Sequence, residues 1–440
     1  MDTAALTSFG EAFTGEVVLP GSADYDAARV VWNGMIDRRP AVIARCTGVD
    51  DVIAAIRFAR DHDLVAAVRC GGHSVGGFST CDDGIVIDLS RMSGVHVDPE
   101  ARTARVAGGS LLRDLDAAAQ AFELACPVGV VGHTGVGGLT LGGGMGRLQR
   151  HWGFSIDNML AVDVVTADGT RVRASEEENP ELFWGMRGAG PNFGVVTGFE
   201  FRLHELGNTV TQGMLLFPAE QAHRIAARVR EWGPSAPVEV MSSFGLGLAT
   251  PEDPPELEGR PIVYMGVTHS GDPADAGDAL RPLRDLGPLV DTIEPRRYLD
   301  VQTMADEEMA GGKRFYMKGG FLAELSDDYV EAGLESVAAA PGAGCHHALA
   351  PGWGDLARRS RRDGLHRPRG AVLAGGGGRV GRRRARRGAH RLGSHHDGGA
   401  AAVHGSRPLR ERHGGVGRGR RAIDLRRCEV RAPRQAETDL

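Results

Sequence analysis

Apolar and polar positions in the first half of the chain repeat with the period of strands at some places and of helices at others. Short apolar or alternating runs predict strands at residues 41–46, 64–70, 84–90, 160–169 and 195–203. Val52, Ile56 and Ala59 share one face of a predicted helix over 50–61, and another helix is predicted over 110–124. This half therefore predicts a unit that mixes helices and strands.

The second half shows longer strand patterns. These occur at residues 210–217, 238–248, 261–268 and 313–323, and helical patterns lie between them near residues 218–232, 272–286 and 327–340. Strand pairs separated by helices are typical of an antiparallel sheet that helices cover on one face. We predict an α+β fold in which residues 1–35 form an N-terminal segment of a first domain, residues 36–208 form that domain, and residues 209–340 form a second domain.

Residues 341–440 follow neither period. Arg, Gly, Ala and His dominate this segment, with no lysine after Lys318, no phenylalanine after Phe321 and no tyrosine after Tyr329. Such a composition cannot bury a core, so we expect no stable fold here. Its arginines suggest phosphate attraction, but natural basic tails commonly mix lysine with arginine. We interpret the segment as a GC-rich coding sequence read in a shifted frame from about residue 341–352, and expect no nucleic-acid partner.

Composition narrows the class of protein. The 440 residues are 42% hydrophobic, enough for at least two cores, and the net charge of −6 argues against a nucleic-acid binder. The start of the chain lacks the features of a signal peptide, and no run reaches the roughly 18 apolar residues of a membrane helix. The six cysteines have no C-x-x-C spacing. We expect a soluble cytoplasmic protein with reduced thiols, no metal site and no membrane partner.

The sharpest chemical signal is a glycine-rich loop between two apolar strands. It consists of Arg69, Cys70, Gly71, Gly72, His73, Ser74, Val75, Gly76 and Gly77. Successive amides in such a turn form an anion-binding nest that suits a pyrophosphate. An imidazole nitrogen of His73 is nucleophilic enough to add to an electrophilic flavin methyl group. The alternative is a solvent-exposed loop with an incidental histidine.

A second glycine-rich loop weakens that alternative. Gly135, Gly137, Gly138, Gly142, Gly143 and Gly144 offer another surface for close backbone approach. Neither loop has the strand-to-helix G-x-G-x-x-G context of a Rossmann site, and a Walker lysine is absent. The two loops therefore point to a dinucleotide bound in some other way.

Together these stretches resemble the berberine bridge enzyme-like FAD-linked oxidases, within the superfamily named after vanillyl-alcohol oxidase and para-cresol methylhydroxylase. The resemblance is detailed from about residue 40 to 203 and includes residues 69–74, 134–146, 157–158 and 182–197. It implies a two-part FAD-binding domain and an antiparallel-sheet substrate domain covered by helices. It also implies that the first loop cradles the FAD pyrophosphate, that His73 joins the flavin 8α-methyl group, and that the cofactor lies along Thr134, Gly135, Gly194, Val195 and Val196.

Some members of this group attach the flavin a second time, through a cysteine. Val131 stands at that position here, and Cys126 lies five residues upstream. A loop shift that brought Cys126 to the flavin would disrupt the matching glycines. We therefore predict a single attachment through His73 and interpret Cys126 as a small buried hydrophobic residue.

The second domain resembles the group less specifically. Segments 297–302 and 314–318 match stretches near the group's substrate cavity. Tyr316 and Lys318 share one face of a predicted strand and are the candidate catalytic residues, which orient a substrate or assist proton removal. The alternative is packing with a solvated lysine tip, and a role for His151 is equally open. The group's closing Y-D-P-x-N-x-F segment, which follows a strand that carries a base, is absent.

These inferences lead to an FAD-dependent oxidoreductase. We expect bound FAD to accept a hydride from a carbon that bears oxygen or nitrogen, in a sugar, an alcohol or a specialised metabolite, and molecular oxygen to reoxidise the flavin with release of hydrogen peroxide. One alternative is a flavin dehydrogenase that uses another acceptor. Another is a catalytically inactive protein that binds flavin or nucleic acid.

Overall fold

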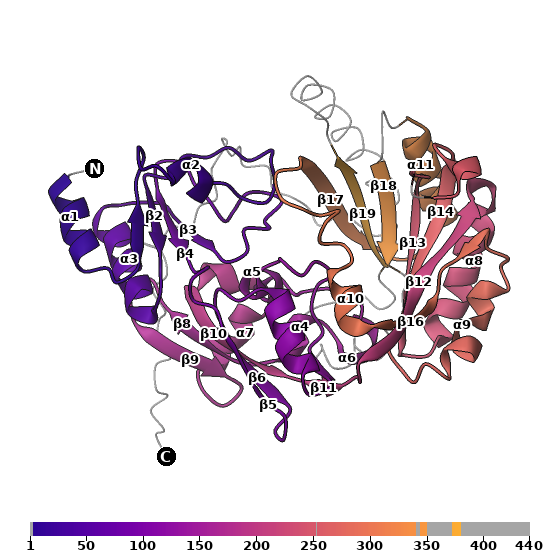
Figure 1. The fold of residues 1–440 in the computed structure, drawn as a ribbon, viewed down its shortest axis with the longest axis horizontal. Helices are drawn as coiled ribbons and strands as arrows, with labels where there is room; N and C mark the ends of the chain where they lie inside the picture. The colour runs from indigo at the N-terminus through magenta and orange to yellow at the C-terminus, as the bar shows by residue number, and fades with distance from the viewer. Residues whose placement is uncertain (1–2, 252, 340–343, 350–371, 380–440) are drawn as a thin grey trace, which may run out of the picture.

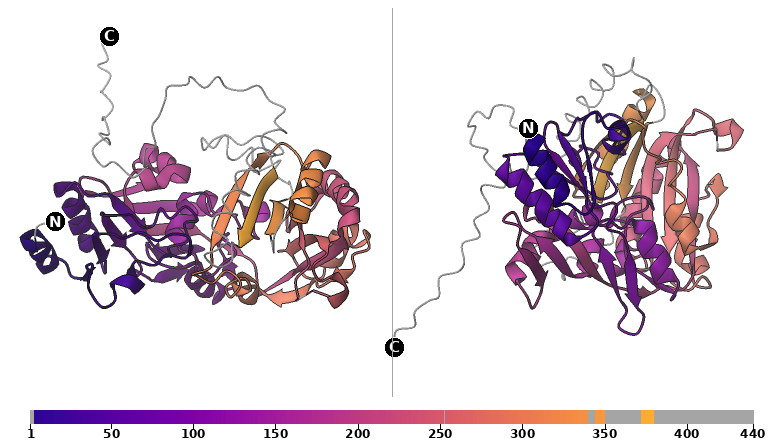
Figure 2. Two further views of the ribbon diagram at one scale, coloured as in Figure 1. Left: turned by 90° about the horizontal axis from the view of Figure 1, so that it is seen from above. Right: turned by 60° about the vertical axis from the view of Figure 1, so that its left-hand side comes forward.

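The computed structural model describes residues 3–251, 253–339, 344–349 and 372–379, which form two regions (Figure 1). We call residues 3–208 the N-terminal region, and the described residues from 209 onward the sheet region. The two regions lie side by side in Figure 1 and in both views of Figure 2. Such a boundary between regions is a common place for a ligand site.

A four-stranded sheet forms the first part of the N-terminal region. Its order is β1 (Glu16–Val18), β2 (Val42–Arg45), β4 (Ile85–Asp88) and β3 (Ala66–Arg69), in which β2, β4 and β3 are parallel and β1 is antiparallel to β2. Helices α1 (Thr3–Glu11) and α3 (Val49–Asp61) add apolar side chains to its core. The apolar face predicted for residues 50–61 is buried there through Val52, Ile56 and Ala59.

A five-stranded antiparallel sheet forms the second part. Its order is β5 (Val95–Asp98), β6 (Thr103–Ala107), β10 (Val195–Arg202), β8 (Met159–Val165) and β9 (Arg171–Ser175). Its core is shared with helices α4 (Leu112–Gln120), α5 (Val136–Leu141) and α7 (Pro180–Ala189). Shorter elements are α2 (Tyr25–Ala28), α6 (Gln149–Trp152), and β7 (Leu124–Ala125) paired with β11 (His204–Glu205).

The sheet region is built on one large antiparallel sheet. Its order is β15 (Val290–Asp291), β12 (Thr209–Pro218), β14 (Pro261–His269), β13 (Val240–Leu248), β18 (Gly344–Leu349), β19 (Val372–Arg379) and β17 (Phe315–Leu322), and β16 (Glu294–Arg297) also pairs with β12. Helices α8 (Ala222–Trp232), α9 (Ala276–Arg284) and α11 (Asp327–Ala339) cover one face (Figure 1). The α+β class and the helix-covered antiparallel sheet are confirmed.

Two strands lie within residues 341–440, the segment for which we predicted no stable fold. Residues 344–349 and 372–379 are the strands β18 and β19, and β19 lies between β18 and β17. Ladder bonds use the N–H and C=O groups that every residue but proline carries, so pairing does not require alternating side chains. The remainder of the segment, residues 341–343, 350–371 and 380–440, lies outside the described residues. Its origin in a shifted reading frame stays a prediction, which translation of the gene in the other two frames tests.

No helix in the described part of the chain is both long enough and apolar enough to cross a membrane.

Candidate cofactor site

The first glycine loop leaves the end of β3 and turns sharply at two glycines. Gly72 and Gly77 have φ angles of +69° and +74°, a backbone region that residues with a Cβ rarely adopt. The Ser74 hydroxyl oxygen accepts a hydrogen bond from the N–H of Phe78 at 3.0 Å and helps to hold the turn. The loop conformation therefore depends on glycine at these two positions.

Two residues at the base of this loop anchor it to the sheet. The Arg69 guanidinium lies 2.6 Å from the Asp88 carboxylate on β4 and donates to the carbonyl of Ala28 at 2.7 Å. Arg69 is buried, so it supports the loop from beneath. Burial raises the pKa of the Cys70 thiol to about 11, which keeps it neutral.

The two glycine loops touch through bare backbone. A Cβ added to Gly71 would lie 2.4 Å from the nitrogen of Gly135, and a Cβ added to Gly135 would lie 2.4 Å from the Cys70 Sγ. Real Cβ atoms do not approach other atoms so closely, so neither glycine accepts a side chain unless the loops separate. Two stretches more than sixty residues apart therefore form one surface, on which His73 and His133 meet.

Beyond this contact the second loop presents open backbone. Among the described residues, no atom lies within 4 Å of a Cβ added to Gly138 or Gly143, and the nearest atom to one on Gly142 is 3.6 Å away. Gly137, in contrast, is buried near the ring of Phe199. The N–H groups of Gly142 and Gly143 donate to the carbonyls of Leu139 and Thr140, so this stretch offers a pyrophosphate or a flavin edge space for close approach to the backbone.

The third predicted stretch lies at the start of β10. Gly194 has a φ of +146°, and a Cβ there would lie 2.4 Å from the carbonyl oxygen of Val165 on the neighbouring strand. Val196 is buried in the core beneath the five-stranded sheet. The carbonyl of Thr134 accepts a hydrogen bond of 2.9 Å from the N–H of Leu112, at the start of α4. These residues fix the sheet and helix on which the loops rest.

His73 lies in a small aromatic and polar cluster. Its ring stacks on Trp32 with centroids 4.8 Å apart, and its Nε2 lies 2.6 Å from the Nδ1 of His133. Burial, and to a smaller extent the nearby His133 ring, lowers the pKa of His73 to about 4. The imidazole is therefore neutral at physiological pH and keeps a lone pair that can attack an electrophile.

The sheet region contributes single groups to this cluster. Phe315 on β17 also stacks on Trp32, with ring centroids 4.1 Å apart, and the carbonyl of Asp306 lies 3.1 Å from the Nε2 of His133. The Asp306 carboxylate accepts the N–H of Gly132 at 2.6 Å. Sequence reasoning assigned no role to Trp32, His133 or Asp306, because none of them belongs to a motif with a known physical role.

Asn33 joins the two regions beside the first loop. Its Nδ2 donates to the carbonyls of Val75 at 2.9 Å and Phe315 at 3.0 Å, and its Oδ1 accepts the N–H groups of Phe315 and Met35, both at 3.0 Å. The side chain is almost fully buried. A single amide thus ties the loop and β17 together.

The candidate catalytic residues Tyr316 and Lys318 lie on β17, the strand that begins at Phe315. Tyr316 is half-buried and Lys318 is exposed. Because side chains alternate along a strand, both lie on the face of β17 opposite to the Phe315 ring that stacks on Trp32. The shared face is as predicted, and their roles in catalysis stay a prediction.

The cysteine considered for a second attachment lies inside the protein. Cys126 is fully buried in the core of the five-stranded sheet, which confirms its interpretation as a small hydrophobic residue. Its pKa is raised far above the ordinary value by burial and by Asp116. Val131, at the position of the attaching cysteine, is also buried.

A second polar cluster is buried between α4 and α10 (Tyr298–Thr303). The Gln302 amide donates to the Asp116 carboxylate and to the carbonyl of Gly129, both at 3.1 Å, and accepts from Arg147 at 3.2 Å. Tyr298 is fully buried beside them. The segment 297–302, which we expected near a substrate cavity, therefore buries Tyr298, Val301 and Gln302. The Gln302 amide contacts Gly129 and Arg147, which flank the second glycine loop.

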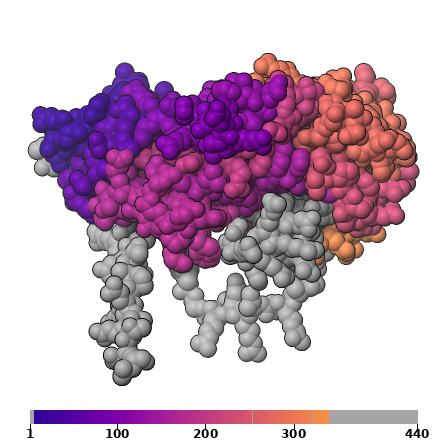
Figure 3. Space-filling model, turned by 90° about the horizontal axis from the view of Figure 1, so that it is seen from below, coloured from indigo at the N-terminus to yellow at the C-terminus, as the bar shows by residue number. Residues whose placement is uncertain are grey.

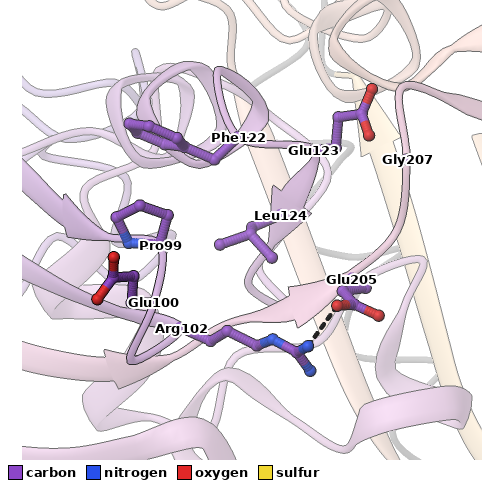
Figure 4. A pocket seen from close by; sticks show the side chains of 8 residues that line it. All are labelled: Pro99, Glu100, Arg102, Phe122, Glu123, Leu124, Glu205 and Gly207. Carbon is purple, nitrogen blue, oxygen red and sulfur yellow. Dashed lines mark hydrogen bonds and ion pairs between the residues drawn. The ribbon is translucent and has the colours of Figure 1, made fainter.

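Two surface hollows lie elsewhere on the N-terminal region and at its border with the sheet region. One has a volume of about 520 Å³ and contains the Arg102–Glu205 ion pair (Figure 4); it is lined by Pro99, Glu100, Arg102, Phe122, Glu123, Leu124, Glu205 and Gly207. The other, of about 510 Å³, includes His151, whose Nδ1 lies 3.0 Å from the Ser270 hydroxyl. Neither contains a residue of the glycine loops. In the view of Figure 3 the two regions adjoin. We place the site at the loops because they meet there and carry His73 and His133.

Comparisons with known proteins identify the family of the chain. Residues 40–175 match the family model of the FAD binding domain. The chain is 43% identical over 297 residues to (R)-6-hydroxynicotine oxidase of Paenarthrobacter nicotinovorans, a match that covers 67% of this chain and 63% of that protein. It is 32% identical over 347 residues to an FAD-linked oxidoreductase of Dictyostelium discoideum, covering 78% and 74%. The crystal structure of 6-hydroxy-D-nicotine oxidase from Arthrobacter nicotinovorans superimposes with a TM-score of 0.78 at 30% identity, covering 89% and 86%.

Proposed function

The chain belongs to the FAD-linked oxidoreductases, and on that premise we propose that it oxidises a small organic molecule with an FAD covalently attached to His73. The contact between Gly71 and Gly135 carries this proposal, because it joins the two loops around the His73 ring. The predicted family and fold are confirmed by the comparisons. The covalent link and the substrate are our proposals.

The residues present fit FAD. The space beside Gly138, Gly142 and Gly143 admits an edge of the cofactor, and the neutral His73 ring supplies the nucleophile for the 8α-methyl group. When bound, FAD supplies the two-electron acceptor that no side chain of the chain provides. The buried stack of Trp32 and Phe315 restricts access of water to the His73 side of the loops.

The proposed substrates are small molecules that carry hydrogen on a carbon bonded to oxygen or nitrogen. The 43% identical relative is named for a hydroxylated nicotine, so a cyclic amine of that kind belongs in the panel together with sugars and alcohols. Tyr316 and Lys318 are the proposed groups that orient the substrate or take its proton. The sheet region, which carries both, is the proposed substrate cover.

The test uses the purified yellow protein and that panel. Under nitrogen, a substrate is expected to bleach the flavin absorbance, and admission of oxygen is expected to restore it with formation of hydrogen peroxide. Bleaching that only an artificial electron acceptor reverses identifies a dehydrogenase in place of an oxidase. A flavin that no member of a broad panel reduces contradicts the enzymatic proposal and favours an inactive flavin-binding protein.

A further inference from the structure

His133 and His73 form a hydrogen bond whose direction follows from their neighbours. The Nε2 of His133 lies 3.1 Å from the carbonyl oxygen of Asp306, and a carbonyl only accepts, so this nitrogen carries the proton. The Nδ1 of a neutral His133 is then an acceptor. It lies 2.6 Å from the Nε2 of His73, which must therefore be the N–H donor.

This direction decides which nitrogen of His73 can attack. With its Nε2 protonated and bonded to His133, the neutral ring of His73 has its lone pair on Nδ1. Among the described residues, the side-chain hydrogen bond of this ring is the one made by its Nε2. Stacking on Trp32 and the bond to His133 fix the plane and the rotation of the ring. The nucleophilic atom is thus free while the opposite nitrogen is held by a base.

We propose that His133 is the base that activates His73 for its covalent attachment to FAD, an inference that rests on the attachment proposed above. With FAD in place, Nδ1 of His73 would form the bond to the 8α-carbon while one C–H bond of that methyl group breaks and its proton passes to water. Nε2 of His73 would give its proton to Nδ1 of His133. The two electrons left on the flavin would reduce dioxygen, which with two protons leaves as hydrogen peroxide.

The surroundings of His133 suit a group that accepts a proton for part of the reaction. Once protonated, its ring still donates from Nε2 to the Asp306 carbonyl and now donates from Nδ1 to the substituted His73. The loop that carries His133 is held by the Asp306 carboxylate through the N–H of Gly132 at 2.6 Å. Without His133 the alkylated ring would keep its second proton and a buried positive charge, which is costly.

The experiment separates binding of FAD from its attachment. The full chain is produced without flavin in riboflavin-starved cells and then mixed with FAD. Quenching of flavin fluorescence measures reversible binding, and flavin fluorescence of the protein band on a denaturing gel, followed over time, measures attachment. The variants are His133→Asn, whose amide can donate to Asp306 and accept from His73 but takes no proton, and His133→Ala. His151→Asn is the matched control, since His151 bonds to Ser270 instead.

We expect His133→Asn to bind FAD within about twofold of the unchanged chain and to attach it about 100-fold more slowly, the usual contribution of a general base. In His133→Ala, added imidazole is expected to restore part of the attachment rate, which a structural defect would not allow. His151→Asn is expected to attach FAD at the normal rate.

Each contrary result has a distinct meaning. Attachment at the normal rate in His133→Asn overturns the role of His133. Parallel loss of reversible binding in both His133 variants also overturns it, because His133 is then a structural residue. If the unchanged chain binds FAD but never attaches it, the covalent link of the proposed function is itself wrong.

Discussion

The N-terminal region and the sheet region build the cofactor site in opposite ways. The N-terminal region supplies backbone: two loops that meet at Gly71 and Gly135, with further glycines left open beside them. The sheet region supplies individual groups, namely the Phe315 ring and the Asp306 carbonyl and carboxylate, each bonded to or stacked on a residue of the other region. The candidate site thus rests on backbone conformation in one region and on single contacts in the other.

This difference predicts which substitutions each region tolerates. A loop that approaches its neighbour through bare backbone accepts no side chain at the contact, whatever the chemistry of that side chain. A region that contributes single groups tolerates substitution at most positions and is sensitive only at the few residues that make those contacts. The following variants test this contrast, from the largest expected effect to the smallest.

Placing a methyl group at the loop contact is expected to have the largest effect. In Gly135→Ala the added Cβ meets Cys70 Sγ and Gly71 N at 2.4 Å, so we expect a loss of about 3 kcal/mol of stability from overpacking and loss of retained FAD. Gly138→Ala is the control, since its Cβ meets nothing within 4 Å. It should fold normally and weaken FAD binding only. Urea unfolding and the ratio of flavin to protein measure both effects, and equal unfolding midpoints for the two variants would refute the loop contact.

Asn33→Ala is expected to have the next largest effect. The substitution leaves the buried N–H of Phe315 and the carbonyls of Val75 and Phe315 without their amide partner, which costs about 2–3 kcal/mol. Asn192→Ala, at an exposed amide, is the control. Thermal unfolding is the measurement. A midpoint for Asn33→Ala as high as that of the control would show that the two regions do not depend on this bridge.

The buried carboxyl of Asp116 predicts a pH dependence. Burial raises the pKa of Asp116 to about 7, although Gln302 and Arg147 act in the opposite direction. The folded state therefore holds this proton more tightly than the unfolded state, so stability falls as pH rises from about 4 through about 7. Between pH 5 and 8 the free energy of unfolding falls by roughly 2.5 kcal/mol through this group.

The variant Asp116→Asn should lose this pH dependence of stability. Asp300→Asn, an exposed control on α10, should keep it. Unfolding in urea at pH 5 and at pH 8 gives the comparison. If the free energy of unfolding of Asp116→Asn differed between pH 5 and pH 8 as much as that of the unchanged chain, the titration would belong to another group.

Tyr316→Phe and Lys318→Met are expected to have the smallest effect, about tenfold in turnover or about 1.4 kcal/mol of activation free energy for each. Steady-state oxidation of a substrate found in the panel is the measurement. Unchanged turnover and unchanged KM in both variants would return both residues to a packing role on the face of β17 opposite to Phe315.

The sequence predicted the part of the site that depends on backbone. Positions such as Gly71, Gly72 and Gly135 could be recognised because glycine in a tight turn or at a close approach has few substitutes. Most helices and strands could be predicted from the spacing of hydrophobic residues, as for residues 50–61 and 195–203. The fold class followed from the order of those elements.

The rest of the site could not be predicted because its residues act through tertiary contacts. Trp32, Asn33 and Asp306 are ordinary residues in sequence. Trp32 and Asn33 gain their partners where β17 packs against the N-terminal segment, and Asp306 gains its partner where the chain before β17 meets the second loop. The strands β18 and β19 were missed because a strand inside a sheet is set by its neighbours' backbone and not by its own side-chain period.

The most direct test of the central claim is whether flavin stays with the chain after denaturation. The purified protein is precipitated with acid, washed, dissolved in detergent and separated on a denaturing gel, together with His73→Ala. We expect a fluorescent flavin band in the unchanged protein and none in His73→Ala, even where that variant binds FAD reversibly before denaturation. Complete release of flavin from the unchanged protein, or an undiminished band in His73→Ala, would contradict attachment through His73.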